Sequence, residues 1–210
     1  QTDDDPLHLQ LTDNLLAFSD HVALRGSTEQ LGDMDEATAS ARWHWAISPR
    51  LALDIGFASV RRMNISSSLV TTLPEEKIFS LLATWQHPDG LTQLSAARRQ
   101  GYADTTPVLL THDQRIDHRL RWYAELGRQL STTESLPLRP VGLKDMASLS
   151  LRYRLSRLDR LALTHAQERY YLQTGARVGR GRHTTLEYTH TYRQDAPTVD
   201  LGAFWSTHGY

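Results

Sequence analysis

Two adjacent segments between residues 36 and 62 alternate apolar and polar side chains, and only Ser48, Pro49 and Arg50 separate them. Successive side chains of a β-strand point to opposite faces, so this two-residue period predicts two strands joined as a hairpin. The apolar rows of the two arms are Ala37, Ala39, Ala41, Trp43, Trp45 and Ile47, then Leu51, Leu53, Ile55 and Phe57.

The length of these arms restricts the class of β protein. Each arm has about 10 to 12 residues, whereas strands of soluble proteins usually have about 5 or 6. A tilted strand needs about 10 residues to cross roughly 25 to 30 Å of hydrocarbon. Tryptophan lies in the apolar row and charge in the other row. The pattern therefore predicts an all-β fold, an antiparallel transmembrane β-barrel.

Composition is compatible with this fold. A hydrophobic content of 40% and a mean hydropathy of -0.47 would ordinarily indicate a soluble protein. In a transmembrane barrel, however, only every second strand residue contacts lipid, so the average stays polar. No run of about 18 or more apolar residues exists, which excludes a membrane-spanning helix. A net charge of -1 with scattered basic residues argues against a nucleic-acid partner.

The same alternation recurs along the chain and predicts about ten or more strands. Residues 1–6 are acidic and end in proline, which predicts a tether before a barrel domain at residues 7–210. The chain starts without methionine or a signal peptide, which predicts a processed or excised segment. Further strands are expected at 7–11, 15–25, 77–86, 91–102, 110–126, 146–156, 161–176, 184–192 and 199–205. Loops or turns are expected at 63–74, 87–90, 103–107, 127–145, 157–160, 179–182 and 193–197.

The connections between these strands alternate only in the first half of the chain. Short turns and long loops should alternate in an outer-membrane barrel. They do so up to residue 110, but the long segment 127–145 is followed by the short turn 157–160. Either one strand is missing from the count or one connection is atypical. An odd strand count would indicate part of a larger barrel.

Charged residues in the polar rows are the candidate pore lining. Each would cost about 2 to 4 kcal/mol in lipid near the midplane, so they must face water or one another. They can form cross-strand ion pairs that stabilise the wall, line a conduit for a polar solute, or do both. The set is Asp54, Arg98, Asp117, Arg119, Arg121, Glu125, Arg152, Arg154, Glu168 and Glu187.

Aromatic residues in the apolar rows are candidates for girdles at the membrane surface. Packing in the core of a soluble sandwich is the alternative, which the strand length disfavours. The set is Trp43, Trp45, Trp85, Trp122, Tyr153, Tyr188 and Trp205.

Other motifs add little chemistry. The sequence patterns of serine hydrolases, zinc proteases and phosphate-binding loops are absent, so we expect no enzymatic activity, no cofactor and no metal site. His112, Asp113 and His118 are better explained as interfacial or lumen residues than as a metal or base site. The basic, glycine-rich segment 175–182 is better explained by a tight turn than by an anion site. Neighbouring tyrosines Tyr170 and Tyr171 predict an interface belt or a bulge.

Two arginine- and tyrosine-containing strands, at residues 149–156 and 184–192, resemble the family of C-terminal porin domains of PelB-like Pel exopolysaccharide exporters. The resemblance implies an outer-membrane barrel that passes a polysaccharide made of amino sugars. It also implies a periplasmic helical-repeat region that feeds the pore and a lipoprotein ring that assists it. Such exporters have more than about ten strands, so it further implies that this chain is part of a larger barrel.

The expected function is therefore that of a bacterial outer-membrane porin, in contact with outer-membrane lipid, that lets a polar polymer pass a water-filled lumen. The polymer expected from the resemblance is an exopolysaccharide. A small plugged barrel that serves as an adhesin or enzyme is the first alternative. A soluble β-sandwich or lipid-binding protein is the second.

Overall fold

The fold is a single antiparallel β-sheet in the computed structural model, which describes residues 19–30, 35–65, 73–132, 138, 141–191 and 198–209. The described residues contain no helix, which confirms the all-β prediction, and no helix long and apolar enough to cross a membrane is found among them. The strands are β1 His21–Gln30, β2 Asp35–Ser48, β3 Leu51–Met63, β4 Glu76–His87, β5 Gly90–Gln100, β6 Val108–Arg115, β7 Leu120–Ser131, β8 Gly142–Arg154, β9 Asp159–Leu172, β10 Arg177–Thr191 and β11 Thr198–Gly209.

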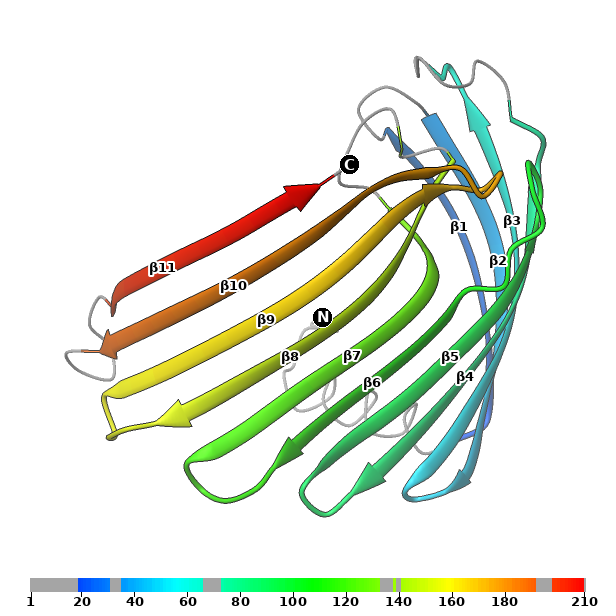
Figure 1. Ribbon diagram of the computed structural model, residues 1–210. Helices are drawn as coiled ribbons and strands as arrows, with labels where there is room; N and C mark the ends of the chain where they lie inside the picture. Colours follow the sequence, from blue (N-terminus) through cyan, green and yellow to red (C-terminus); the bar gives the residue numbers. More distant parts are fainter. Residues whose placement is uncertain are drawn as a thin grey trace, which may run out of the picture.

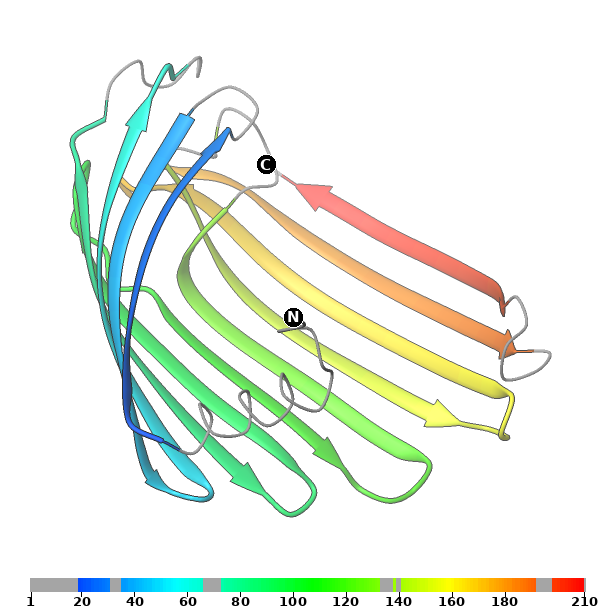
Figure 2. The ribbon, with the colours of Figure 1, turned by 180° about the vertical axis from the view of Figure 1, so that it is seen from behind.

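Each strand pairs with its neighbours in the sequence, so the sheet is a meander from β1 to β11 (Figure 1). Nine of the eleven strands have 11 or more residues, the exceptions being β1 and β6. The sheet is strongly curved, and β1 and β11 lie at its opposite margins (Figure 2). These two strands do not pair with each other in the described part of the chain, so the sheet is not closed there.

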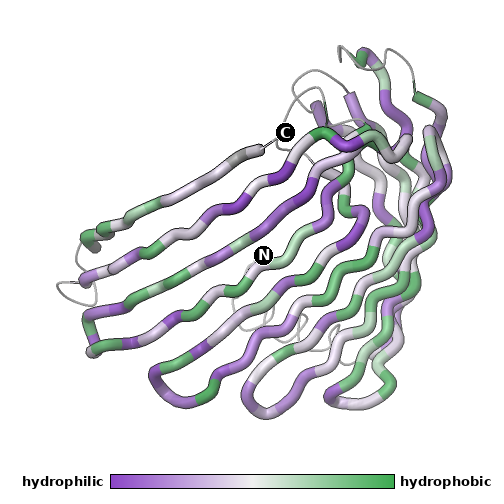
Figure 3. Tube along the Cα trace, in the orientation of Figure 1, coloured by the Kyte–Doolittle hydropathy of each residue, from purple (hydrophilic) through white to green (hydrophobic). Residues whose placement is uncertain are grey.

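The register gives the sheet one apolar and one polar face. Trp43 lies opposite Ile55, and Ile55 lies opposite Leu81, so the apolar rows of successive strands share one side. We call this side the apolar face and the other the polar face; green and purple segments alternate along the strands in Figure 3. Leu24 is 80% exposed and Trp205 is 58% exposed, and no second sheet covers the apolar face in the described residues. The two-layer core of a soluble sandwich is absent from this part of the structure.

One predicted strand is in fact a hairpin. Residues 110–126 were expected as one strand, but a turn at residues 116–119 separates β6 from β7. The prediction was wrong because apolar Ile116 and Leu120 keep the alternating phase through the turn. Asp117 forms the turn by accepting hydrogen bonds from the backbone N–H groups of Arg119 and Leu120 at 2.6 and 2.8 Å.

The additional turn restores the alternation of connections. Short turns lie at 49–50, 88–89, 116–119 and 155–158, along the lower margin of the sheet in Figure 1, and we call this the turn end. The strand ends that flank the longer connections 64–75, 101–107 and 132–141 lie at the opposite margin, which we call the loop end. Long and short connections therefore alternate from β3 to β9, as an outer-membrane barrel requires.

Other predicted boundaries also differ from the structure. Segment 127–145 was expected as a loop, but β7 extends to Ser131 and β8 begins at Gly142, with a register shift between Gly127 and Leu130. Segment 179–182 was expected as a turn but lies inside β10, and the turn is at 173–176, where Gly175 has a φ of 88°. The sequence shows glycine in both places and cannot tell a strand glycine from a turn glycine.

A register shift lies opposite the neighbouring tyrosines, which agrees with the bulge, one of the two alternatives expected there. The register of β9 and β10 shifts between Arg177 and Gly179, opposite Tyr171 and Tyr170. The acidic tether at 1–6, the strand at 7–11, the first residues of the strand at 15–25 and the loop at 193–197 lie outside the described residues.

Gly90, the first residue of β5, allows close packing against β6. A Cβ atom at this position would overlap the backbone carbonyl oxygen of Asp113 and would lie 2.7 Å from Cε1 of His87. The absence of a side chain also lets the rings of His87 and His112 stack across β5, with their centroids 5.3 Å apart. Glycine is therefore required at this position by close packing.

We expect the substitution Gly90→Ala to destabilise the protein by about 1 to 3 kcal/mol, because backbone must move to accept the methyl group. Gly26→Ala is the matched control, since nothing lies within 4 Å of a Cβ at that strand position. Urea denaturation of the full-length protein in detergent measures both variants. Equal midpoints for the two variants would contradict the packing described for Gly90.

Candidate pore-lining face

Glu76 is the centre of a buried ion-pair network on the polar face at the loop end. Its carboxylate accepts hydrogen bonds from Arg62 at 2.8 Å and from Arg99 at 2.9 Å, and a second Arg99 contact is 2.7 Å long. Arg62 also pairs with Glu36 at 2.9 Å, and the Arg99 guanidinium donates to the hydroxyl of Ser131. The side chain of Glu76 is only 8% exposed. The network joins β2, β3, β4, β5 and β7, so it braces one end of the curved sheet.

A second buried cluster surrounds Asp54 on β3. One carboxylate oxygen lies 2.9 Å from Nε of Arg42 and 2.9 Å from Nδ1 of His44. The ring of His44 stacks on His21, with centroids 4.9 Å apart. Asp54, predicted to line the pore, is thus on the polar face but is covered by its partners.

Further ion pairs cross the middle strands. Arg121 makes two parallel hydrogen bonds to Asp113, both 2.6 Å long, the bidentate geometry that arginine and carboxylate favour. Lys144 binds Glu168 at 3.0 Å. Arg121 and Glu168 therefore lie on the polar face, as predicted, and each is engaged with a neighbouring strand.

The other predicted lining residues on the polar face are less constrained. Among the described residues, Glu125 accepts a single long hydrogen bond of 3.4 Å, from the hydroxyl of Tyr123. Arg152, Arg154 and Glu187 are exposed and form no ion pair with another described residue. These side chains are available to water or to a solute along the polar face.

Three predicted lining residues lie elsewhere. Arg98 pairs in register with Phe79, so it belongs to the apolar face, where it contacts Asp104 at 3.5 Å. Its neighbour Arg99 occupies the polar face. Leu91 lies on the polar face of β5 and Leu94 on its apolar face, so the leucines of this strand do not form one row. The sequence pattern therefore assigned Arg98, and not Arg99, to the polar face.

Asp117 and Arg119 lie in the turn between β6 and β7 and not on a strand wall. Hydrogen bonds from the N–H groups of Arg119 and Leu120 hold the pKa of the Asp117 carboxyl below its usual range. Because the folded state lowers this pKa, the stabilisation is present at neutral pH and is lost as the pH falls through the lowered value.

Sequence reasoning missed the buried members of the network, namely Glu36, Arg62, Glu76 and Arg99. Glu76 precedes the segment in which alternation was recognised. Arg61 and Arg62 are consecutive, and the pattern did not show which of the two lies on the polar face. Extending the apolar rows of β3 and β4 to their ends would have placed Arg62 and Glu76 on the polar face.

A comparison with protein-family models identifies the family of this chain. The family model described as "PelB, C-terminal beta barrel domain" matches residues 16–210. The chain belongs to the PelB C-terminal β-barrel family. No curated protein matches the chain. The family is an export barrel and not a catalytic domain family, and its fold agrees with an outer-membrane protein.

The aromatic residues of this PelB-type domain occupy the apolar face. Trp45, Trp85, Trp122 and Tyr153 lie close to the ends of their strands at the turn end. Trp43 stacks on Trp45 with centroids 6.2 Å apart. Tyr188 lies opposite Leu161, and Trp205 lies opposite Thr184, so both aromatic residues are also on the apolar face.

The histidine candidates do not form a metal site. His112 faces the apolar side with Trp122, with ring centroids 4.7 Å apart, whereas Asp113 faces the polar side. No group of three or more metal-ligating side chains converges among the residues that the structure describes.

We expect Glu76→Gln to destabilise the PelB-type domain by about 3 kcal/mol, because it leaves two buried guanidinium groups with a weaker acceptor. The matched control is Glu187→Gln on the same face, which should change stability by less than about 0.5 kcal/mol. Urea midpoints of the full-length variants in detergent provide the measurement. A loss for Glu187→Gln as large as that for Glu76→Gln would show that burial of the network is unimportant.

Proposed function

We propose that this chain forms part of the wall of an outer-membrane porin through which an exopolysaccharide of the Pel type leaves the cell. The observation that carries the proposal is the division of one long-stranded sheet into an apolar and a polar face, in a member of the PelB barrel family. The apolar face suits lipid, and the polar face suits a water-filled lumen.

The polar face can contact a polysaccharide without holding it tightly. Asp54, Glu76 and Asp113 are neutralised by arginine partners at 2.6 to 2.9 Å. Between these pairs the face carries small hydroxyl side chains, such as Ser150 and Thr164, which share a hydrogen bond of 2.9 Å. A translocated solute must bind well enough to enter and weakly enough to leave. Hydroxyl groups and paired charges meet this condition.

The charge of the lumen distinguishes this wall from a simple cation channel. Arg152, Arg154 and Arg160 are exposed at the turn end of the polar face and pair with no carboxylate of the described residues. The wall therefore offers no net negative surface at this end. We propose that hydrogen bonds to sugar hydroxyl and amide groups, more than charge attraction, accompany the polymer.

Additional strand pairing is needed to complete the barrel. β1 and β11 pair on one side only in the described sheet, and unpaired backbone groups cost several kcal/mol each in hydrocarbon. We propose that in the membrane both edges pair, with each other or with strands outside the described residues. A periplasmic helical-repeat region and a lipoprotein ring are the proposed partners that deliver the polymer.

Accessibility labelling tests which face meets water. Leu151 and Arg152 are neighbours on β8, both exposed, and they lie on the apolar and polar faces respectively. In membranes that contain the full-length protein, a water-borne maleimide should label Arg152→Cys and leave Leu151→Cys unlabelled, on a background without other cysteines. Equal labelling of the two positions would overturn the assignment of faces.

Planar bilayers test for an open pore and separate it from a plugged barrel, which passes little current. The full-length protein should conduct, and Arg152→Ser with Arg154→Ser should lower its preference for anions because two lumen cations are removed. Arg61→Ser with Arg98→Ser on the apolar face is the matched control and should leave ion selectivity unchanged. A protein that inserts but does not conduct would contradict the porin and favour the plugged alternative.

A further inference from the structure

A group of arginines lies on the apolar face at the loop end of strands β7, β9 and β10. Arg180 lies opposite Arg169, and Arg177 lies opposite Tyr171, so they continue the row that contains Leu163 and Leu186. The group consists of five residues, which we call the arginine patch: Arg128, Arg169, Arg177, Arg180 and Arg182. All five side chains are exposed.

The patch carries uncompensated positive charge. None of its members forms an ion pair with a carboxylate of the described residues. The nearest acidic residue in register is Asp145, opposite Arg169. Its carboxylate is already engaged by the N–H of Gln129 at 2.9 Å and by the hydroxyl of Tyr171 at 2.7 Å.

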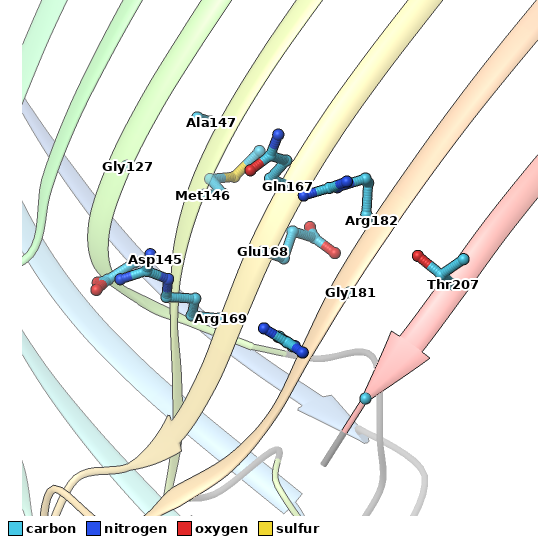
Figure 4. Close-up of a pocket in the computed structure, with 12 residues that line it drawn as sticks. Gly127, Asp145, Met146, Ala147, Gln167, Glu168, Arg169, Gly181, Arg182 and Thr207 are labelled. Atoms are coloured by element: carbon cyan, nitrogen blue, oxygen red, sulfur yellow. The ribbon is translucent and has the colours of Figure 1, made fainter.

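The patch also provides space for a ligand. Arg169, Arg177, Gly179 and Arg180 line a cavity of about 340 Å³. A second cavity of about 530 Å³ extends from Arg169 and Arg182 to Thr207 on β11, and Figure 4 shows these residues on adjacent strands. Asp145 and Glu168 also line this cavity, and Glu168 is held by Lys144 at 3.0 Å. Guanidinium groups from β9 and β10 therefore border the same two cavities, so one anionic group can contact both strands.

The position along the strands identifies the environment. Arg169 is six residues beyond Leu163 on β9, a distance of roughly 20 Å along an extended strand. His165 and Gln167 occupy the intervening positions of the row, so the face changes from apolar to polar to cationic toward the loop end. Charged side chains on the lipid side of a barrel are tolerated near the interface and not at the midplane. This gradient along the strand favours headgroup depth for the patch.

We propose that the arginine patch binds the phosphate groups of lipids in the outer leaflet. This inference rests on the proposed function, because it requires an outer-membrane barrel whose long loops face outward. Arginine matches phosphate by planar, bidentate hydrogen bonding, and the five unpaired guanidinium groups complement a polyanionic headgroup. Lipid bound at this site fixes the depth of β8 to β11 in the membrane and covers a cationic surface that lipid tails would not tolerate.

Lipid binding by the purified full-length protein in detergent tests the proposal. The probe is lipid A, a diphosphorylated glycolipid, and the comparison is lipid A from which the phosphates have been removed. Arg169→Gln with Arg180→Gln should weaken lipid A binding about tenfold or more in native mass spectrometry, because two charge-assisted contacts are lost. Arg50→Gln with Arg157→Gln, two exposed arginines at the turn end, is the matched control and should bind as the wild type does.

Three outcomes would overturn the proposal: equal lipid A affinity of the patch variant and wild type, equal wild-type affinity for the dephosphorylated lipid, or patch-dependent binding of an acidic peptide in preference to lipid A. If the patch variant does not assemble, the two lipids compared on the wild type still decide the question. Heat-modifiable mobility and bilayer conductance report the barrel separately. A conducting patch variant with unchanged lipid binding would therefore refute the lipid site and leave the proposed porin intact.

Discussion

A strand that forms the wall of a membrane barrel must separate lipid from water across the thickness of one backbone. Hydrogen bonding in the meander satisfies the backbone inside the sheet, which hydrocarbon cannot do. The side chains are then sorted by position alone, since alternate residues point to opposite faces. The register of β2, β3 and β4, with Trp43, Ile55 and Leu81 in one row, shows how strictly this sorting is kept. The polar face, the aromatic rows and the arginine patch all depend on it.

The charges of the polar face are used in two ways. At the loop end, Glu76 joins arginines from two strands in a buried network that stabilises the curvature of the sheet. At the turn end, Arg152 and Arg154 remain exposed. Ion pairs also form toward the turn end, where Asp54 binds Arg42 and Asp113 binds Arg121, so paired and exposed charges lie side by side there. The polar face therefore combines cross-strand pairs along its length with unpaired arginines at the turn end.

The apolar face is also graded along the strands. Aromatic rings concentrate near the turn end, where Trp45 and Trp85 lie close to their hairpins. Unpaired arginines concentrate near the loop end, beside Arg169 and Arg180. Amphipathic rings and cations both prefer the interface to the hydrocarbon interior, but only the cations select for anionic headgroups. The two ends of the face are therefore chemically different, as the two leaflets of an asymmetric membrane are.

The sequence by itself determined the fold class, the hairpin at residues 36–62 and most of the polar face, because a two-residue period is a local property that each strand carries alone. The sequence-based prediction failed where the alternation of side chains does not reveal the backbone conformation. The alternation continues through the turn at 116–119, and the glycines at 179 and 181 lie within a strand. Only the tertiary structure decided between Arg98 and Arg99, assembled Glu76 with Arg62 and Arg99, and brought Arg169 beside Arg180. These arrangements depend on the register between strands, and register is set by pairing across the sheet.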